Sequence, residues 1–485
     1  FLYGLIAVGF VVLAVVSLVW KSGIVNRTAT AVTIDGQKYS AAEVDYFYYN
    51  AYSSIRQNQY ASYMGIDTSK PLSQQDLSSM AKLMLGVDED MTWDAYLKQN
   101  AKNQLIQMTV LNKAAKDAGF EFTDDMQAQV DKNMDQLASY AKQKGVSTAA
   151  YLKNVYGKNM TTSVFKKLLT EGIYVSAYDQ SYQNGLSYTD DQIAAYYADN
   201  KNDFDVVNYE YILFKGTANS TKDDSGNTVQ PTDEQNAAAL AAAQEAAAAA
   251  LSRAKAGGSL EDIAKDYDMA TYSSQVEGTY NSSSALSAWV FDASRQSGDC
   301  DMVNDGSNYY IALYHSRTRH DYNTVDVRHI LFRVDTSDLD SSADGYQTKL
   351  DERKAEQKQA AEDALQKWKD GAATEESFAE LANELSDDGG SNTAGGLYTE
   401  VYKGMMVTEF NDWCFDASRQ PGDTGIVAND GSYIGYHVMY FVGTDIPYWQ
   451  VQVKSAMMSK DYNDWMNSLT ENVTATEAGG MKYVG

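Results

Sequence analysis

Val327-Arg-His-Ile-Leu-Phe332 and Tyr436-His-Val-Met-Tyr-Phe-Val442 decide the fold of the stretch that they enclose. Both segments are rich in β-branched and aromatic residues, which favour strands. Each segment carries one histidine, His329 or His437, although the chain has only four histidines. Successive side chains of a strand alternate between its two faces. We therefore expect two neighbouring strands whose histidines point inward, next to each other.

A helix, an acidic turn and an apolar loop lie between these two strands in the sequence. In Ser377–Asp388 apolar residues recur at i, i+3, i+4 and i+7, which places them on one face of a helix. Ser377 and Glu380 have the spacing of a capped helix start. Asp388 precedes two glycines, a composition typical of turns, and the apolar loop Gly404–Phe410 follows. The stretch is therefore predicted to fold as one small α+β domain.

The same pattern of segments occurs earlier in the chain, which indicates an internal duplication. Phe291-Asp-Ala-Ser-Arg-Gln-Ser-Gly-Asp299 recurs 124 positions later as Phe415-Asp-Ala-Ser-Arg-Gln-Pro-Gly-Asp423. Three further pairs match in the same order: Tyr209–Phe214 with Val327–Phe332, Ser259–Ala264 with Ser377–Ala382, and Asn304–Ser307 with Asn429–Ser432. Chance does not explain four matches in one order, so we predict two copies of one domain, at 204–318 and 322–445.

The part of the chain before the duplication, 30–202, is predicted to be mainly helical. It begins with a hairpin, Ala31–Tyr39, whose Asp35-Gly36 pair suits a tight turn. Ser40-Ala-Ala-Glu43 has the spacing of a capping box and predicts a helix start. Further helices are expected near 91–118, 123–143, 159–183 and 189–200.

After the duplication, residues 446–485 are predicted to form a C-terminal helix and a tail. Pro447 interrupts the chain, and the helix is expected over 451–469. It carries an apolar stripe that requires a packing partner. The tail 471–485 is polar and contains glycine, so we expect it to be loose.

The N-terminal segment 1–22 is predicted to be a transmembrane anchor. Phe1–Trp20 contains no charged residue, and roughly 20 apolar residues are needed to cross a bilayer as a helix. Trp20 and Lys21 follow the aromatic and charged pattern of a membrane interface. A cleaved signal peptide is the alternative, since Ala29-Thr-Ala31 has the composition of a cleavage site. With a retained anchor, the chain is a single-pass cell-membrane protein whose bulk is extracytoplasmic.

Composition argues against several kinds of function. Acidic residues outnumber basic ones, 66 against 39, for a formal net charge of −27, whereas nucleic-acid binding needs clustered basic residues. Cys300 and Cys414 are the only cysteines and lie far apart, so neither a disulfide framework nor a zinc site is expected. Asp340–Gly345 with Asp351 echoes a calcium loop, but the last ligand is Asp and no helix precedes the loop. A solvated loop is favoured, and no metal or other cofactor is predicted.

With all of these motifs in order, residues 322–445 resemble a parvulin-type peptidyl-prolyl isomerase. The hairpin followed by helices resembles the chaperone domain of PrsA- and SurA-like foldases, in which a C-terminal segment, here 446–472, completes that domain. The resemblance implies that His329 and His437 form a hydrogen-bonded pair under the active site and that Asp388 lies beside the substrate carbonyl. These three residues are the predicted catalytic set. The implied proline pocket consists of Leu397, Met406 and Phe410.

The first copy departs from this family pattern at every site position. Tyr211 replaces His329, and Tyr310 replaces His437. The remaining replacements are Ala270 for Asp388, Ser282 for Met406 and Leu286 for Phe410. We therefore expect the first copy to fold without catalysing, and to act in spacing or client contact. In the second copy, Tyr398 stands where the family commonly has glycine, which leaves the shape of the pocket open.

The resemblance implies a function in protein folding. Rotation about an X-Pro bond faces a barrier of ~18–20 kcal/mol and is slow enough to limit folding. An extracytoplasmic foldase of this kind binds unfolded exported proteins and isomerises their X-Pro bonds with residues 322–445. The alternative is a non-catalytic holdase or assembly scaffold whose parvulin-like domains only bind peptide. The sequence leaves the oligomeric state open, a homodimer included.

Overall fold

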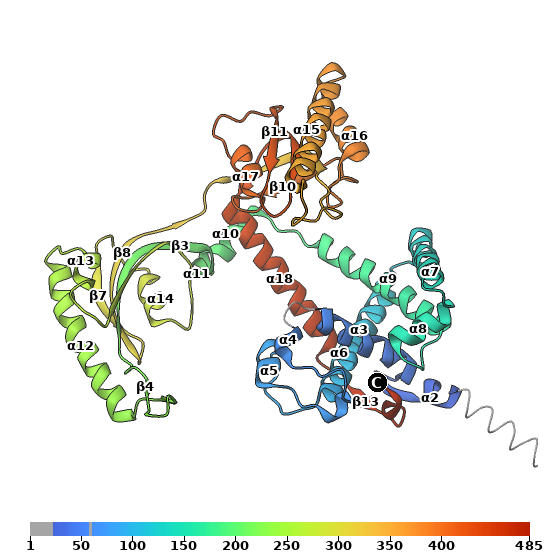
Figure 1. The fold of residues 1–485 in the computed structure, drawn as a ribbon, viewed down its shortest axis with the longest axis horizontal. Coiled ribbons are helices and arrows are strands. Elements are labelled where there is room, and N and C mark those ends of the chain that lie inside the picture. The colour runs from blue at the N-terminus through green and yellow to red at the C-terminus, as the bar shows by residue number, and fades with distance from the viewer. Residues whose placement is uncertain (1–22, 58–60) are drawn as a thin grey trace, which may run out of the picture. The chain divides into compact units, whose positions relative to one another are not determined.

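The computed structural model describes residues 23–57 and 61–485 (Figure 1). The predicted membrane anchor at 1–22 lies outside the described residues. Within the described ranges, no helix is both long and apolar enough to cross a bilayer. Contacts divide the chain into two compact units: the residues up to Ser187 together with Met458–Gly485, and Tyr188–Met457. The architecture is α+β with antiparallel sheets.

Long helices dominate the first unit, and threonine side chains cap their starts. Thr92, Thr123 and Thr161 each accept a hydrogen bond from a backbone N–H of the first turn, which satisfies a donor that the helix leaves unpaired. The helices are α2 (Ile24–Thr28), α3 (Ala41–Gln57), α4 (Ala61–Met64), η1 (Leu72–Gln74), α5 (Ser79–Leu85), α6 (Trp93–Asp117), α7 (Asp124–Gln143), α8 (Thr148–Tyr156) and α9 (Thr162–Gly185). The long helices predicted near 91–118, 123–143 and 159–183 are present, whereas α5 and α8 were not predicted.

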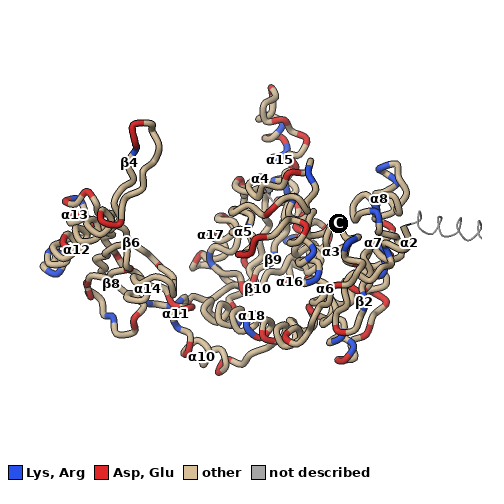
Figure 2. The backbone as a smooth tube through the Cα atoms, turned by 90° about the horizontal axis from the view of Figure 1, so that it is seen from below, with Lys and Arg blue, Asp and Glu red and all other residues tan. Residues whose placement is uncertain are grey.

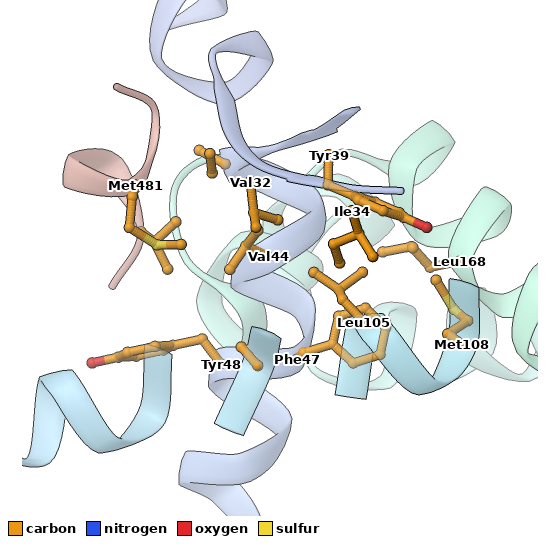
Figure 3. Close-up of a cluster of buried hydrophobic side chains, with 14 of the residues drawn as sticks. Val32, Ile34, Tyr39, Val44, Phe47, Tyr48, Leu105, Met108, Leu168 and Met481 are labelled. Atoms are coloured by element: carbon orange, nitrogen blue, oxygen red, sulfur yellow. The ribbon is translucent and has the colours of Figure 1, made fainter. Parts of the chain in front are cut away.

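A small sheet packs on these helices and includes a strand from the C-terminal tail. β1 (Thr30–Ile34) and β2 (Gln37–Ser40) form the predicted hairpin, and β13 (Ala475–Glu477) pairs with the outer edge of β1. After β13, the short helix η2 (Met481–Tyr483) buries Met481 in the core of this unit (Figure 3). The prediction of a loose tail is therefore wrong.

The second unit contains two four-stranded antiparallel sheets with the same strand order. The first has the order β6-β3-β8-β7 and the second the order β10-β9-β12-β11. In the first copy the strands are β3 (Asp205–Lys215), β6 (Ala270–Gly278), β7 (Cys300–Asn304) and β8 (Asn308–Arg319), with a small hairpin β4 (Thr221–Lys222) and β5 (Thr228–Val229). In the second copy they are β9 (Asn323–Arg333), β10 (Leu397–Val401), β11 (Thr424–Asn429) and β12 (Gly435–Pro447).

Each sheet is covered by one long and two short helices. They are α12 (Asp233–Lys255), α13 (Leu260–Ala264) and α14 (Ala285–Val290) in the first copy, and α15 (Tyr346–Asp370), α16 (Glu375–Leu385) and α17 (Thr408–Cys414) in the second. The helix α16 begins earlier than predicted. Thr374 is its N-cap, and Ser377 lies in the first turn as the partner of Thr374 in a capping box.

The two copies share a backbone irregularity on their edge strands β6 and β10. Glu277 and Glu400 both adopt a positive φ, 53° and 52°. Their backbone N–H groups donate to Asn208 and Asp326, which occupy equivalent positions on β3 and β9. The connection into this strand differs, however, because it is five residues longer in the second copy (Ala382 to Gly396) than in the first (Ala264 to Ser273). The additional residues form a loop that carries part of the candidate site.

The C-terminal helix α18 (Tyr448–Thr470) contributes to both units. In the second unit, Trp449 and Val453 pack with residues of α10 (Asp190–Asp199) and α11 (Lys201–Phe204). In the first unit, Trp465 stacks on Tyr182 of α9, with ring centroids 3.7 Å apart. The C-terminal segment that belongs to the first unit therefore starts at Met458 and includes the tail, whereas the predicted segment was 446–472.

Candidate functional site

The two strand histidines of the second copy lie against each other in the middle of its sheet. In the pairing of β9 with β12, His329 lies opposite Met439 and His437 lies opposite Leu331. The histidines are therefore diagonal neighbours on one face. Their Nδ1 atoms are 3.0 Å apart, and both side chains are buried. The structure thus brings together the two residues that the sequence placed on neighbouring strands.

Asp388 completes this arrangement from the loop after α16. Its Oδ2 atom lies 2.9 Å from Nε2 of His329 and accepts hydrogen bonds from Ser391 Oγ and Tyr398 OH. Its Oδ1 atom accepts from the backbone N–H of Gly390. These bonds, the one with His329 first, hold the pKa of the Asp388 carboxyl well below its usual range against the opposing effect of burial. Asp388 is therefore a carboxylate at neutral pH.

Tyr433 extends the line of hydrogen bonds at the other end. Its hydroxyl lies 2.8 Å from Nε2 of His437. We call the residues His329, His437, Asp388, Ser391, Tyr398 and Tyr433 the His–Asp network. Burial, and then the neighbouring His329, lower the pKa of His437 to about 3, so this imidazole is neutral at neutral pH.

A single orientation of hydrogens satisfies the whole network when both imidazoles are neutral. Asp388 can only accept, so His329 donates from Nε2 and accepts at Nδ1. His437 then donates from Nδ1 and accepts at Nε2 from the hydroxyl of Tyr433. Along the line from Tyr433 through His437 and His329, each donor therefore points toward Asp388.

Five residues of the His–Asp network, all except Ser391, line a cavity of about 380 Å³. The residues that line it are His329, Leu331, Arg333, Asp387, Asp388, Gly389, Tyr398, Met405, Met406, Val407, Phe410, Tyr433 and His437. Phe410 is 2% exposed, and its ring meets both imidazoles edge to face, with centroids 5.4 and 5.3 Å away. The cavity therefore combines an apolar wall on α17 and its preceding loop with the charged carboxylate of Asp388.

Leu397 does not line this cavity, in contrast to the prediction. Leu397 pairs with Arg328 on β9, whereas the next residue, Tyr398, pairs with Val327. Neighbouring residues of a strand point to opposite faces, so Tyr398 lines the cavity in the place that the family resemblance implied for Leu397. Its hydroxyl bonds to Asp388 as described, which explains how a bulky residue is accommodated in the place where glycine was expected.

The first copy has a different arrangement at the equivalent place. Tyr310 lies opposite Leu213 on β3, the register position that His437 occupies opposite Leu331. The rings of Tyr211 and Tyr310 are 5.8 Å apart, and the hydroxyl of Tyr310 bonds to Asp305. The longer connection that carries Asp388 has no counterpart here, because the strand β6 starts directly at Ala270, opposite Phe214.

The remaining candidate positions of the first copy, and the acidic loop, hold no arrangement of this kind. Ser282 is exposed, and Leu286 is buried in an apolar cluster. In the calcium-like loop, Asp340 accepts hydrogen bonds from Ser342, and Asp351 accepts from Gln347. Across 23–57 and 61–485, no three His, Cys, Asp or Glu side chains are grouped so that they could hold a metal ion.

Residues 310–444 match the family model of the PPIC-type PPIase domain. The second copy is therefore a parvulin-type domain, and the matched segment contains the whole His–Asp network. The matched segment covers less than a third of the chain's length. No curated protein is similar enough to match the chain.

Several solved structures are similar to the chain at low identity. PrsA from Bacillus subtilis is 15% identical over 79% of this chain and 87% of its own, with a TM-score of 0.30. PrsA from Bacillus anthracis is 21% identical with a TM-score of 0.19, and the match covers 31% of this chain and 58% of that one. A structure reported for two SurA-like chaperones of Campylobacter jejuni, PEB4 and Cj1289, is 12% identical over 71% of this chain and 96% of its own, with a TM-score of 0.17.

Proposed function

We propose that the chain is an extracytoplasmic foldase that binds unfolded exported proteins and isomerises their X-Pro bonds with residues 322–445. The observation that carries this proposal is the line of hydrogen bonds from Asp388 through His329 to His437, three residues that line a cavity with an apolar wall. It lies inside the segment that matches the PPIC-type PPIase domain. Isomerisation breaks no covalent bond, so it needs neither a nucleophile nor a metal ion.

The carboxylate of Asp388 acts on the electronic structure of the substrate amide. A planar amide carries partial negative charge on its oxygen because of resonance, and this charge decreases as the C–N bond twists. A fixed carboxylate beside that oxygen repels the planar form more than the twisted one. Asp388 therefore stabilises the transition state relative to the bound substrate, which is the requirement for catalysis.

The apolar wall holds the proline ring and excludes water. Met406, Val407 and Phe410 supply this wall from α17 and the loop before it. The twisted amide is less polar than the planar one, so a dry surrounding favours it. The same wall fixes the ring while the preceding residue rotates, which is a positioning effect.

The two histidines act as positioning residues. His329 and His437 are only 4% and 2% exposed. We therefore assign the contact with the substrate to Asp388, which the hydrogen-bonded line holds in place, rather than to an imidazole. In this proposal His329 fixes the carboxylate, and His437 fixes the tautomer of His329. Loss of either histidine is expected to weaken catalysis through displacement of Asp388.

Client binding is assigned to the helical first unit and to the first copy. The short helix α5 supports this assignment, since Leu83 is 77% exposed and the neighbouring Met80 is 47% exposed. Exposed apolar side chains of this kind suit unfolded chains. The segment 1–22 is proposed to hold the protein in the cell membrane, with the folded part on the extracytoplasmic side.

The alternative function is a holdase or assembly scaffold that binds peptide without isomerising it. A protease-free isomerisation assay separates the two proposals, because it follows cis and trans populations of a short X-Pro peptide by NMR line broadening. We expect catalysis by the chain and a large loss in Asp388→Ala, with unchanged circular dichroism. A chain that accelerates no isomerisation, while it still prevents aggregation of an unfolded protein, favours the holdase.

A further inference from the structure

The strand β6 forms one edge of the first copy's sheet. It spans nine residues, Ala270–Gly278, and among the described strands it pairs only with β3. Its counterpart β10 in the second copy spans five residues and leaves the register after Tyr398. The first copy thus lacks the loop that carries Asp388 and has a longer regular edge in its place.

The register shows which backbone groups this edge presents. The N–H of Lys215 donates to the carbonyl of Met269, at 3.2 Å, just before the strand begins. In an antiparallel pair the bonded positions alternate, so Thr271, Ser273 and Gln275 exchange hydrogen bonds with β3. The N–H and C=O groups of Tyr272 and Ser274 therefore point away from the sheet.

The side chains of β6 leave these outward groups accessible. The strand carries neither proline nor a charged residue before Glu277, in a chain whose net charge is −27 (Figure 2). Gln275 donates to Ser273 on the same face, at 3.0 Å, and Val276 is 79% exposed. Exposed edges are usually blocked by Lys, Pro or a very short strand. Here the positive φ at Glu277 is the single irregularity, and it comes at the end.

We propose that β6 binds an extended, uncharged segment of an unfolded client, which adds to the sheet as a fifth strand. The outward groups recur at alternate residues, and a backbone in the extended conformation presents partners at the same spacing. Backbone pairing is independent of sequence, which suits a protein with many clients. The inference rests on the client binding of the proposed function and gives the non-catalytic copy a specific role in it.

A substitution at Ser274 tests this proposal directly. Proline at this position removes an outward N–H without breaking a bond to β3, whereas Ser274→Ala retains the N–H and serves as the matched control. The probe is a fluorescein-labelled, Pro-free, uncharged peptide rich in Thr and Val, and its binding to the chain is measured by anisotropy. We expect Ser274→Pro to weaken binding about fivefold, the effect of one net hydrogen bond, and Ser274→Ala to bind as the original chain does.

Two further measurements keep the test decisive. Val276→Lys is expected to weaken binding, and the probe N-methylated at alternate residues is expected not to bind. If Ser274→Pro loses its β-sheet signal in circular dichroism, these two measurements decide. Equal binding by Ser274→Pro and Ser274→Ala, or by the methylated probe, overturns the proposal.

Self-association and catalysis are measured in parallel. The original chain could dimerise in sedimentation, become monomeric with Ser274→Pro and never bind the probe. In that case β6 is an interface between copies, which also overturns the proposal. The isomerisation assay gives an independent result, since Ser274 lies outside the His–Asp network. Loss of probe binding in Ser274→Pro with full isomerisation locates the effect at β6. Probe binding by a chain without isomerase activity contradicts only the proposed catalysis.

Discussion

The Nδ1 atoms of His329 and His437 lie 3.0 Å apart, so one of them must donate and the other accept. Two protonated imidazoles are excluded at this distance, because both Nδ1 atoms would then carry a hydrogen. When both imidazoles are neutral, the carboxylate of Asp388 at the far side of His329 decides which nitrogen donates. The hydrogen-bond partner of His329 therefore also fixes the tautomer of His437, and this coupling yields testable predictions.

Replacement of Asp388 is expected to remove most of the catalysis. Asp388→Asn keeps the size of the side chain and removes its charge, so we expect kcat/KM for a short X-Pro peptide to fall by about 10²-fold. Tyr398→Phe removes one donor to the carboxylate and leaves its charge, so the expected loss is smaller. NMR exchange measurements on the peptide give both values. An Asp388→Asn chain as active as the original contradicts the electrostatic role.

Acid is expected to destabilise the second copy through His437. Its folded pKa of about 3 lies below the ordinary value of 6.5, so between these values the unfolded chain binds more protons. Stability then falls as the pH decreases through this window. The lowered pKa of Asp388 acts in the same direction at lower pH. Hydrogen exchange of β9 and β12 at pH 7 and at pH 4.5 measures the effect, and His437→Asn is expected to reduce it.

The first unit is expected to respond to pH in the opposite direction. Asp45 is buried and accepts hydrogen bonds from Asn159 and from the backbone N–H of Gly485. Burial raises the pKa of its carboxyl to about 6, so the folded unit binds more protons than the unfolded chain between about pH 4 and 6. Its stability therefore decreases as the pH rises through this window.

Hydrogen exchange also checks the prediction for Asp45. The amides of β1 and α3 are expected to exchange more slowly at pH 4.5 than at pH 7, and the difference is expected to exceed the one that the intrinsic exchange rate accounts for. Asp45→Asn is expected to abolish this difference, although one of its two hydrogen bonds is lost. The same exchange data contain β9 and β12, so opposite slopes in the two units exclude a general effect of acid. Equal slopes would contradict the assignment.

The sequence predicted the parts of the site that come from regular elements. His329 and His437 were placed on adjacent strands because strand composition and alternation are local signals. Met406 and Phe410 were assigned to a pocket through the family resemblance, and both line the cavity. Ser391 and Tyr433 were missed, since each reaches the network from a loop whose path depends on the folded sheet.

The C-terminal tail shows a second limit of sequence analysis. Its strand β13 is short and polar, and it pairs with β1 at the opposite end of the chain. No local pattern encodes a partner at that separation. Gly480 lies so close to β1 that a side chain there would collide with the carbonyl oxygens of Ala29 and Thr30, a requirement that appears only in the folded sheet.

Histidines introduced into the first copy are expected not to restore catalysis. Tyr211→His with Tyr310→His recreates the pair of imidazoles at the equivalent register. The carboxylate that orients the pair is still missing, because the first copy lacks the loop that carries Asp388. We test the double substitution in the Asp388→Ala background, where only the first copy can contribute to isomerisation. Measurable activity there would show that two histidines in a parvulin-like sheet suffice.

A side chain at Gly396 is expected to displace Asp388 without touching it. Gly396 has a positive φ of 69°, and its carbonyl accepts the N–H of His329 at 2.9 Å. A Cβ atom there would collide with the carbonyl oxygen of His329, so Gly396→Ala forces the loop away from β9. Gly443→Ala is the matched control, because it lies on β12 with open space around it.

We expect Gly396→Ala to lower kcat/KM about tenfold or more, since small displacements of a catalytic group have large effects. It is also expected to destabilise the second copy, because a non-glycine residue with this φ is strained. Gly443→Ala should change neither quantity appreciably. A crystal structure or the exchange rates around Asp388 would show the displacement. If Gly396→Ala retains full activity while the loop has moved, the position of Asp388 beside the substrate is not required, and the proposed role of the carboxylate is wrong.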